Sequence, residues 1–439
     1  MIAAGALGTL VFFAALISWL NPRLTRYVES EAFRREMEME TAKGLHLEST
    51  RFAPIRRTGF FGLQSKEAAG SNGRKALTNL QARGVFARFN PWGIFLRRWQ
   101  LDLLEIDSGE VGIQTYEPKP EPSPAKPWYV LFLPGRVYLK RVDSEPVDVT
   151  WNFLREKSGF FATHLLITPN GRDFEYRANG GVFRLALVPD LELEGTHLYI
   201  NHDVLKVYRL DLISRERNAD AIGTIHLRGE AGVKGSRSIA AESEFDRLPL
   251  SRWVPKSWQG HVLGKASGKV RYTSQSPAAQ TSSGEATLRV ESGRIEGLAL
   301  LDKLAAISGK PALRTLSLGE CSLAIEWRYP QIHLRRLVLE DAEKLRVEGE
   351  ITVEDQSLAG TIQLGVARPY LEWLPHPEEI FRRDEQGYLW TTVHLSGTLR
   401  DPKQDLSPRI AEALKESPGA ALGIFFRGVA DWFRRAFGD

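Results

Sequence analysis

The stretch LRVEGEITVEDQSLAGTIQLGV, residues 345–366, decides the fold class of this chain. Apolar side chains alternate with charged or small ones through both halves of it, and the run EDQS at 354–357 separates the halves. Because successive side chains of a β-strand point to opposite faces of its sheet, each half is predicted to be a strand with one apolar and one polar face. The alternation recurs in residues 389–395. Several such strands predict a mainly β protein with an extended, twisted antiparallel sheet.

The apolar face of such a sheet has two possible covers. A second sheet covers it in a sandwich, whereas a bound ligand covers it in an open groove. Both arrangements give the same alternation, so the sequence leaves both open. Each buried methylene contributes about 0.8 kcal/mol, so a lipid chain would bind an open groove without polar contacts. The candidate lipid-contacting side chains are Val347, Ile351, Ile362, Leu364 and Val393.

The N-terminal residues Ile2–Leu20 contain no charged side chain. As a helix they would rise about 29 Å, enough to cross the hydrocarbon core of a bilayer. We therefore predict a transmembrane anchor over residues 1–21, with a cleaved signal peptide as the alternative. Four arginines between residues 23 and 35 follow the span. By the positive-inside rule they favour a cytoplasmic body, so charge alone leaves the orientation open.

Beyond the anchor, changes in composition divide the chain. The small, uncharged run SQSPAAQTSS at 274–283 predicts a boundary or a flexible loop. Asn179-Gly180 between two apolar runs predicts a hairpin, and Asp107–Gly109 predicts a turn within residues 101–113. The predicted parts are a juxtamembrane helix over 22–45, an N-terminal β-rich domain over 46–273, a C-terminal β domain over 284–405 and C-terminal helices over 406–439.

The last predicted helix is amphipathic. It runs from Pro418 to Phe437, and its apolar stripe lies beside three arginines. This pattern is typical of a helix at a membrane interface or in a partner's groove, although a helix that closes the end of its own sheet has the same pattern. The candidate membrane-interface residues are Phe425, Phe426, Trp432 and Phe433.

Composition argues against several function classes. The 58 basic and 54 acidic side chains leave a net charge of only +4, too small over this length to predict nucleic acid binding. Cys321 is the single cysteine, so an intramolecular disulfide or a multi-cysteine metal site is excluded. No common catalytic or phosphate-binding motif occurs. We therefore expect a protein that is not an enzyme and that has no cofactor.

Two phrases of the sequence resemble the AsmA-like family of bacterial envelope proteins, including its TamB-type members. They are LRVESGRIEGLALLDKLAAISG at 288–309 and VHLSGTLRDP at 393–402, and RRWQLDLLEIDSGEVGI at 97–113 is similar to a β-repeat of that family. The resemblance implies a single-pass inner-membrane anchor, a periplasmic body and a lipid-lined groove. It also implies a role in moving phospholipid to the outer membrane or in maintaining that membrane.

The expected partners are accordingly the inner membrane and phospholipid. The alternative from a different class is a non-transporting envelope scaffold or regulator. In that alternative the apolar face would be a closed core, and the C-terminal helix would bind an envelope protein.

Overall fold

The computed structural model describes most of the chain between residues 21 and 415. The described ranges are 21–73, 77–95, 99–114, 137–151, 158–171, 173–186, 188–201, 203–215, 222–232, 237–254, 256–276, 279–399 and 401–415. The predicted span Ile2–Leu20 and the predicted interface residues Phe425, Phe426, Trp432 and Phe433 lie outside these ranges. Among the helices within them, none combines the length and apolar character needed to cross a bilayer.

The chain divides into two compact units. Unit 1 comprises Met1–His202 with Val207–Leu210, and unit 2 comprises Asp203–Lys206 with Asp211–Asp439. The division falls within one strand, β12 (Val204–Arg215). The run at 274–283, predicted as a boundary or loop, lies between two paired strands inside unit 2. It is therefore a loop and not a boundary between the two units, because small polar residues suit a hairpin connection as well as a linker.

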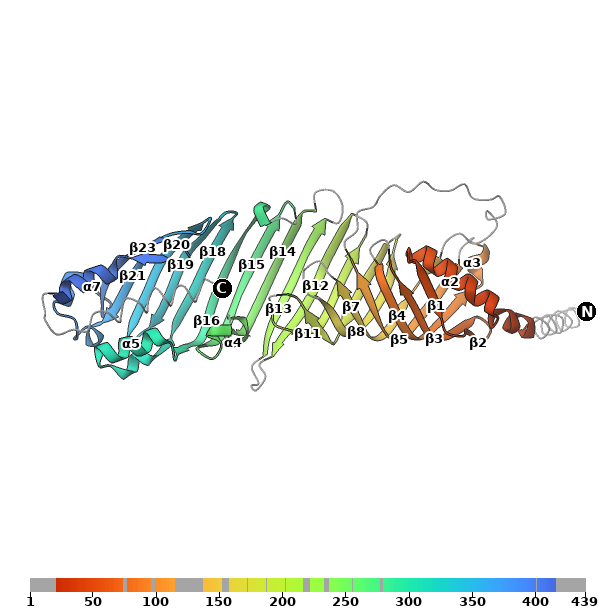
Figure 1. Ribbon diagram of the computed structural model, residues 1–439, viewed down its shortest axis with the longest axis horizontal. Helices are drawn as coiled ribbons and strands as arrows, with labels where there is room; N and C mark the ends of the chain where they lie inside the picture. Colours follow the sequence, from red (N-terminus) through yellow and green to blue (C-terminus); the bar gives the residue numbers. More distant parts are fainter. Residues whose placement is uncertain are drawn as a thin grey trace, which may run out of the picture. The chain divides into compact units, whose positions relative to one another are not determined.

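Unit 1 is built on strands with a helix at one edge (Figure 1). Its elements are α2 (Glu31–Leu45), β1 (Ser49–Phe52), β2 (Arg56–Thr58), β3 (Gly62–Ser71), β4 (Leu77–Asn90), α3 (Trp92–Phe95), β5 (Trp99–Ile113), β6 (Val137–Leu139), β7 (Val142–Trp151), β8 (Ser158–Asn170), β9 (Asp173–Asn179), β10 (Val182–Arg184) and β11 (Leu191–Ile200). The pairs are antiparallel except that β5 runs parallel to β6 and β7. A parallel pair needs a long connection, and 23 residues, 114–136, separate β5 from β6 in the sequence.

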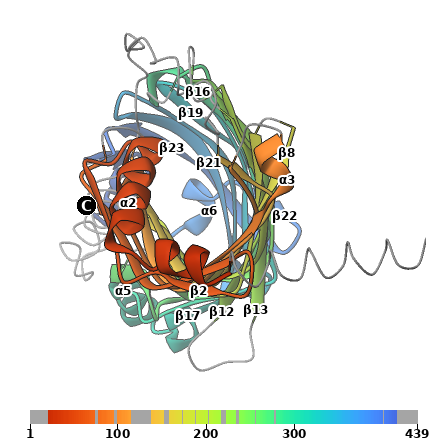
Figure 2. The same cartoon turned by 90° about the vertical axis from the view of Figure 1, so that its right-hand side faces the viewer.

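The predicted juxtamembrane helix is interrupted. Residues 21–28 are helical, and α2 starts afresh after Ser30, whose Oγ accepts a hydrogen bond from the N–H of Phe33 at 3.2 Å. The helix α2 runs beside β1, where the side chain of Glu38 accepts a hydrogen bond from the N–H of Phe52 at 2.9 Å (Figure 2). It ends at Leu45, because His46 adopts a left-handed conformation.

Two predicted turns in unit 1 are wrong. The residues 101–113 form one continuous strand, because Gly109 lies so close to the carbonyl of Gln81 on β4 that a side chain there would collide with it. The Asn179-Gly180 step is not a hairpin either, since β9 and β10 both pair with β8 as successive parts of one run. Gly180 and Gly181 have φ values of 70° and 79°, so they form a kink that the strand run passes through.

Unit 2 confirms the mainly β, antiparallel fold class. Its elements are β13 (Ile222–Gly232), β14 (Ile239–Pro249), α4 (Leu250–Trp253), β15 (Val262–Ser274), β16 (Ser282–Glu296), α5 (Ala299–Ser308), β17 (Thr315–Leu318), β18 (Glu320–Arg328), β19 (Gln331–Asp341), β20 (Leu345–Glu354), β21 (Ser357–Ala367), α6 (Pro377–Ile380), β22 (Arg383–Glu385), β23 (Tyr388–Gly397), β24 (Pro402–Gln404) and α7 (Leu406–Lys415). The long strands pair in chain order, each antiparallel to the next, from β13 to β16 and then through β18, β19, β20, β21 and β23.

Candidate functional site

One face of the unit 2 sheet carries mainly apolar side chains and glycine, and we call it the apolar face. A single row of cross-strand partners crosses nine strands with only apolar side chains or glycine. The row consists of Ile225, Phe245, Gly268, Leu288, Leu323, Leu337, Gly349, Ile362 and Val393. Since side chains alternate between faces, the neighbouring rows two residues away belong to the same face.

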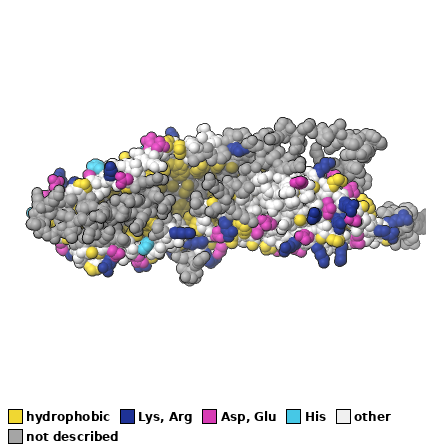
Figure 3. Space-filling model, in the orientation of Figure 1, with side chains coloured by type: hydrophobic (Ala, Val, Ile, Leu, Met, Phe, Trp, Pro, Cys, Tyr) yellow, Lys and Arg dark blue, Asp and Glu magenta, His cyan; other side chains and the backbone are white. Residues whose placement is uncertain are grey.

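The apolar face is only half-buried over the middle of the sheet. Every residue from Glu320 to Glu340 is half-buried or exposed, and the same holds for all of β20. Ile332 on β19 keeps 42% of its surface exposed. Figure 3 shows hydrophobic side chains gathered over β14 and β15 on the visible face. A strand in the core of a sandwich buries one face completely, and these strands do not.

The five predicted lipid-contacting side chains lie on this one face. Val347 pairs with Leu364, Ile362 pairs with Val393, and Ile351 has the parity of Val347 on β20. Four of them are half-buried, whereas Val393 is 7% exposed. Val393 packs with two buried leucines of β21 and β23, and Leu406 of α7 lies against that cluster.

The covering of β21 and β23 comes from the C-terminal elements of unit 2. The segment 371–381 and α7 contribute to a buried cluster of Leu371, Leu374, Ile380, Phe381, Leu389 and Ile410. Arg409 fixes α7 to β23, because its guanidinium donates to the carbonyl of Thr392 at 2.6 Å and to the hydroxyl of Thr391 at 3.2 Å. The apolar face is therefore closed at its last strands. On β18–β20 it is covered at one end, where leucines of α5 and β17 pack against Cys321, Leu339 and Leu345, and it is half-exposed over the rest.

Two glycines on the apolar face leave room for the aromatic rings of neighbouring strands. A Cβ on Gly284 would come within 2.4 Å of the Trp327 ring, and one on Gly268 within 2.8 Å of the Phe245 ring. The two aromatic side chains thus rest on bare backbone of the neighbouring strand. They present flat apolar surfaces, which suit contact with a flexible hydrocarbon better than with a specific polar group.

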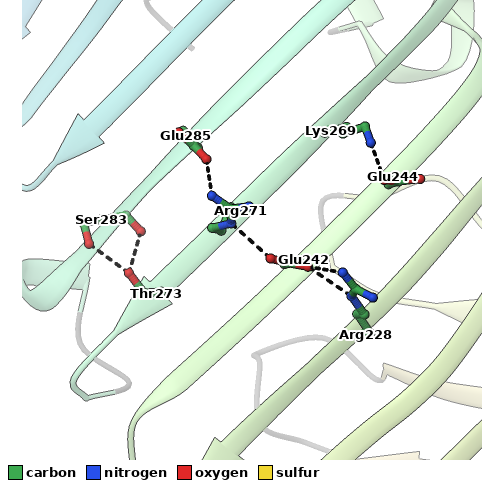
Figure 4. Close-up of polar contacts among 8 residues, drawn as sticks. All are labelled: Arg228, Glu242, Glu244, Lys269, Arg271, Thr273, Ser283 and Glu285. Carbon is green, nitrogen blue, oxygen red and sulfur yellow. Dashed lines mark hydrogen bonds and ion pairs between the residues drawn. The ribbon is translucent and has the colours of Figure 1, made fainter.

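The opposite face carries a ladder of ion pairs (Figure 4). Arg228 and Arg271 both contact Glu242, at 2.6 and 3.0 Å, and Arg271 also contacts Glu285 at 2.5 Å. Hydrogen bonds from Arg228, and to a smaller extent from Arg271, hold the pKa of Glu242 below its usual range. These pairs are solvent-exposed, so each adds little stability, but together they match the strands in register. This face is therefore the polar, solvent-exposed face of the sheet.

Cys321, the single thiol of the chain, lies on the apolar face and is not activated for chemistry. Cys321 pairs with Leu339, and burial raises the pKa of its thiol to about 11. A thiol with so high a pKa is not a nucleophile near neutral pH. Among the described residues, no group of histidine, cysteine, aspartate or glutamate side chains is arranged to hold a metal ion. What this face offers is contact area.

Unit 1 has an apolar row of its own, which the sequence interpretation missed. The successive partners are Leu63, Ala87, Leu104, Val142, Ile167, Tyr176 and Leu198. Burial raises the pKa of the Tyr176 hydroxyl, which agrees with an apolar surrounding. Register shifts in β4 and in the pairing of β7 with β8 interrupt the alternation, so a fixed two-residue pattern cannot reveal the row.

Comparison of the chain with protein-family models, with curated proteins and with solved structures gives no match. The functional argument therefore depends on the chain's own residues.

Proposed function

We propose that this chain is a membrane-anchored envelope protein whose apolar sheet face forms a groove that binds the acyl chains of phospholipid. The observation that carries the proposal is the half-burial of the apolar side chains on β18, β19 and β20. A continuous apolar surface left partly exposed in a sheet of this length favours a ligand or partner that covers it. Hydrocarbon fits it because the rows of side chains that cross many strands are apolar, and the one acidic side chain at the end of β19, Asp341, is paired with Lys344 at 2.9 Å.

The energetics of the proposed contact are favourable without any polar recognition. About ten methylenes buried along the face contribute about 8 kcal/mol before the costs of ordering the lipid are subtracted. The closed cluster around α7 would form one end of the groove. Binding of this kind discriminates poorly between headgroups, which suits a protein that carries bulk phospholipid.

The cellular setting is part of the same proposal. The resemblance of residues 288–309 and 393–402 to the AsmA-like family supports an inner-membrane protein with a periplasmic body, whereas the four arginines between residues 23 and 35 favour the opposite orientation. The uncharged run Ile2–Leu20 supports the anchor. Together these features support a role in transport of phospholipid to the outer membrane or in the integrity of that membrane.

The test is photo-crosslinking in cells with the full chain. A benzophenone amino acid at Ile325 faces the apolar side of β18, and the same group at the adjacent Ala324 faces the ion-pair side. We expect phospholipid adducts, identified by mass spectrometry, from position 325 and not from position 324. Protein adducts at position 325 without lipid would overturn the lipid groove and support the alternative of a non-transporting scaffold.

A further inference from the structure

One end of the strands of unit 1 carries exposed aromatic side chains, which we call the aromatic tip: Phe60, Phe61 and Trp92. Their exposed fractions are 39%, 43% and 69%. Phe60 and Phe61 form the turn between β2 and β3, and their rings pack edge to face with centroids 5.0 Å apart. The N–H of Phe89 donates to the carbonyl of Phe61 at 2.9 Å, which places the end of β4, and Trp92 just after it, at the same end of the strands.

The aromatic tip is tied to the point where the predicted span ends. The guanidinium of Arg57 lies 5.0 Å from the centre of the Phe60 ring and donates to the Phe60 carbonyl at 3.0 Å. The same guanidinium donates to the carbonyl of Asn21 at 3.0 Å and to the hydroxyl of Thr25 at 2.9 Å. Asn21 directly follows Leu20, the last residue of the predicted span. One side chain therefore links the turn to the chain as it would leave a bilayer.

The two chain segments that form the aromatic tip carry only basic charges, and two carboxylates lie beside them. Glu29 accepts a hydrogen bond from the N–H of Arg57 at 3.2 Å, and Asp102 accepts one from the side-chain amide of Asn90 at 2.8 Å. Residues 56–62 and 88–92 contain Arg56, Arg57 and Arg88 and no acidic side chain, a formal charge of +3. Arg88 pairs with Gly62, immediately beside the turn. Exposed aromatic rings with arginine behind them are the combination found at membrane–water interfaces, where rings enter the headgroup layer and cations meet lipid phosphates.

We propose that the aromatic tip inserts into the headgroup layer of an anionic phospholipid bilayer and holds this end of unit 1 against the membrane surface. The inference rests on the anchor of the proposed function and adds a second contact to it. Its consequence is orientation, because a single helix lets the attached body rotate and tilt, whereas a second contact beside the helix fixes which end of the strands faces the lipid.

The experiment uses the full chain in lipid nanodiscs of phosphatidylcholine and phosphatidylglycerol, with Cys321→Ser to remove the native thiol. An environment-sensitive fluorophore is attached at Phe60→Cys, at Trp92→Cys, or at Ser71→Cys as the control. Ser71 lies at the opposite end of β3 from Gly62, about 30 Å away along the strand. We expect nitroxide lipids to quench the label at positions 60 and 92, and aqueous iodide to quench the label at 71 several-fold more strongly than at either.

Two results would overturn the inference in distinguishable ways. If the protein enters the discs and iodide quenches the label at 60 and 92 as strongly as at 71, the tip does not touch the membrane although the anchor stands. If the protein does not associate with the discs at all, as judged by size-exclusion chromatography, the proposed anchor falls together with the tip contact.

Discussion

Replacement of Ile362 by aspartate should weaken phospholipid binding strongly without unfolding the sheet. Ile362 is half-buried on the apolar face, with Val393 and Gly349 as its cross-strand partners. A hydrocarbon chain that crosses the sheet advances one strand every ~4.8 Å, so a single lining side chain faces about four methylenes. Loss of those contacts to a hydrated carboxylate removes about 3 kcal/mol, or about two orders of magnitude in affinity.

The assay for this prediction is displacement of a fluorescent phospholipid from the purified full chain, with circular dichroism to verify the fold. The matched control is Thr361→Asp, which places the same carboxylate one residue away on the exposed opposite face. That variant should bind lipid as the native chain does. A folded Ile362→Asp protein with native affinity, or an equal loss in the control, would refute the reasoning.

Three further predictions concern stability and reactivity. The hydroxyl of Tyr388 donates to Glu340 at 3.1 Å, and burial raises the pKa of Tyr388 from 10.0 to about 12. Because this tyrosine ionises at lower pH in the unfolded chain than in the folded one, the free energy of unfolding should fall between pH 10 and pH 12. A chemical denaturation series across that range should lose this slope in Tyr388→Phe, and an unchanged slope would contradict the assignment. The thiol of Cys321 should alkylate slowly at pH 8 and faster toward pH 11, while the unfolded chain reacts readily at pH 8; fast alkylation of the folded chain would contradict its burial. Gly284→Ala should lower the free energy of unfolding by about 1–3 kcal/mol, whereas Gly319→Ala, with open space around it, should be neutral by the same denaturation assay.

The alternation in residues 345–366 predicted two strands, and the structure places them at β20 and β21 with Leu345 opposite Val366. The helix α5 likewise ends where a local signal stands, at Gly309, which adopts φ 65°. These features depend on local rules, namely side-chain period and helix capping, which neighbouring residues alone determine.

The features that the sequence failed to predict depend on distant partners. Gly109 looked like a turn residue, yet the close carbonyl of Gln81 requires a glycine inside a strand. The parallel pairing of β5 with β7 leaves no pattern in either strand's own residues, because strand direction depends on the connection between the strands. The aromatic tip brings together residues about thirty positions apart, so Phe60 and Trp92 could not be grouped before β3 and β4 were paired.

The half-buried strands have a thermodynamic consequence. Over the middle of β18–β20 the apolar face is only half-buried, so these strands lack part of the hydrophobic stabilisation that a second layer would give. Acyl chains on the apolar face would act as the missing half of the core, and by mass action a ligand at a hundred times its dissociation constant adds about 2.7 kcal/mol to the free energy of unfolding. Folding and lipid supply would then be linked, and a chain that has delivered its lipid would be the less stable one.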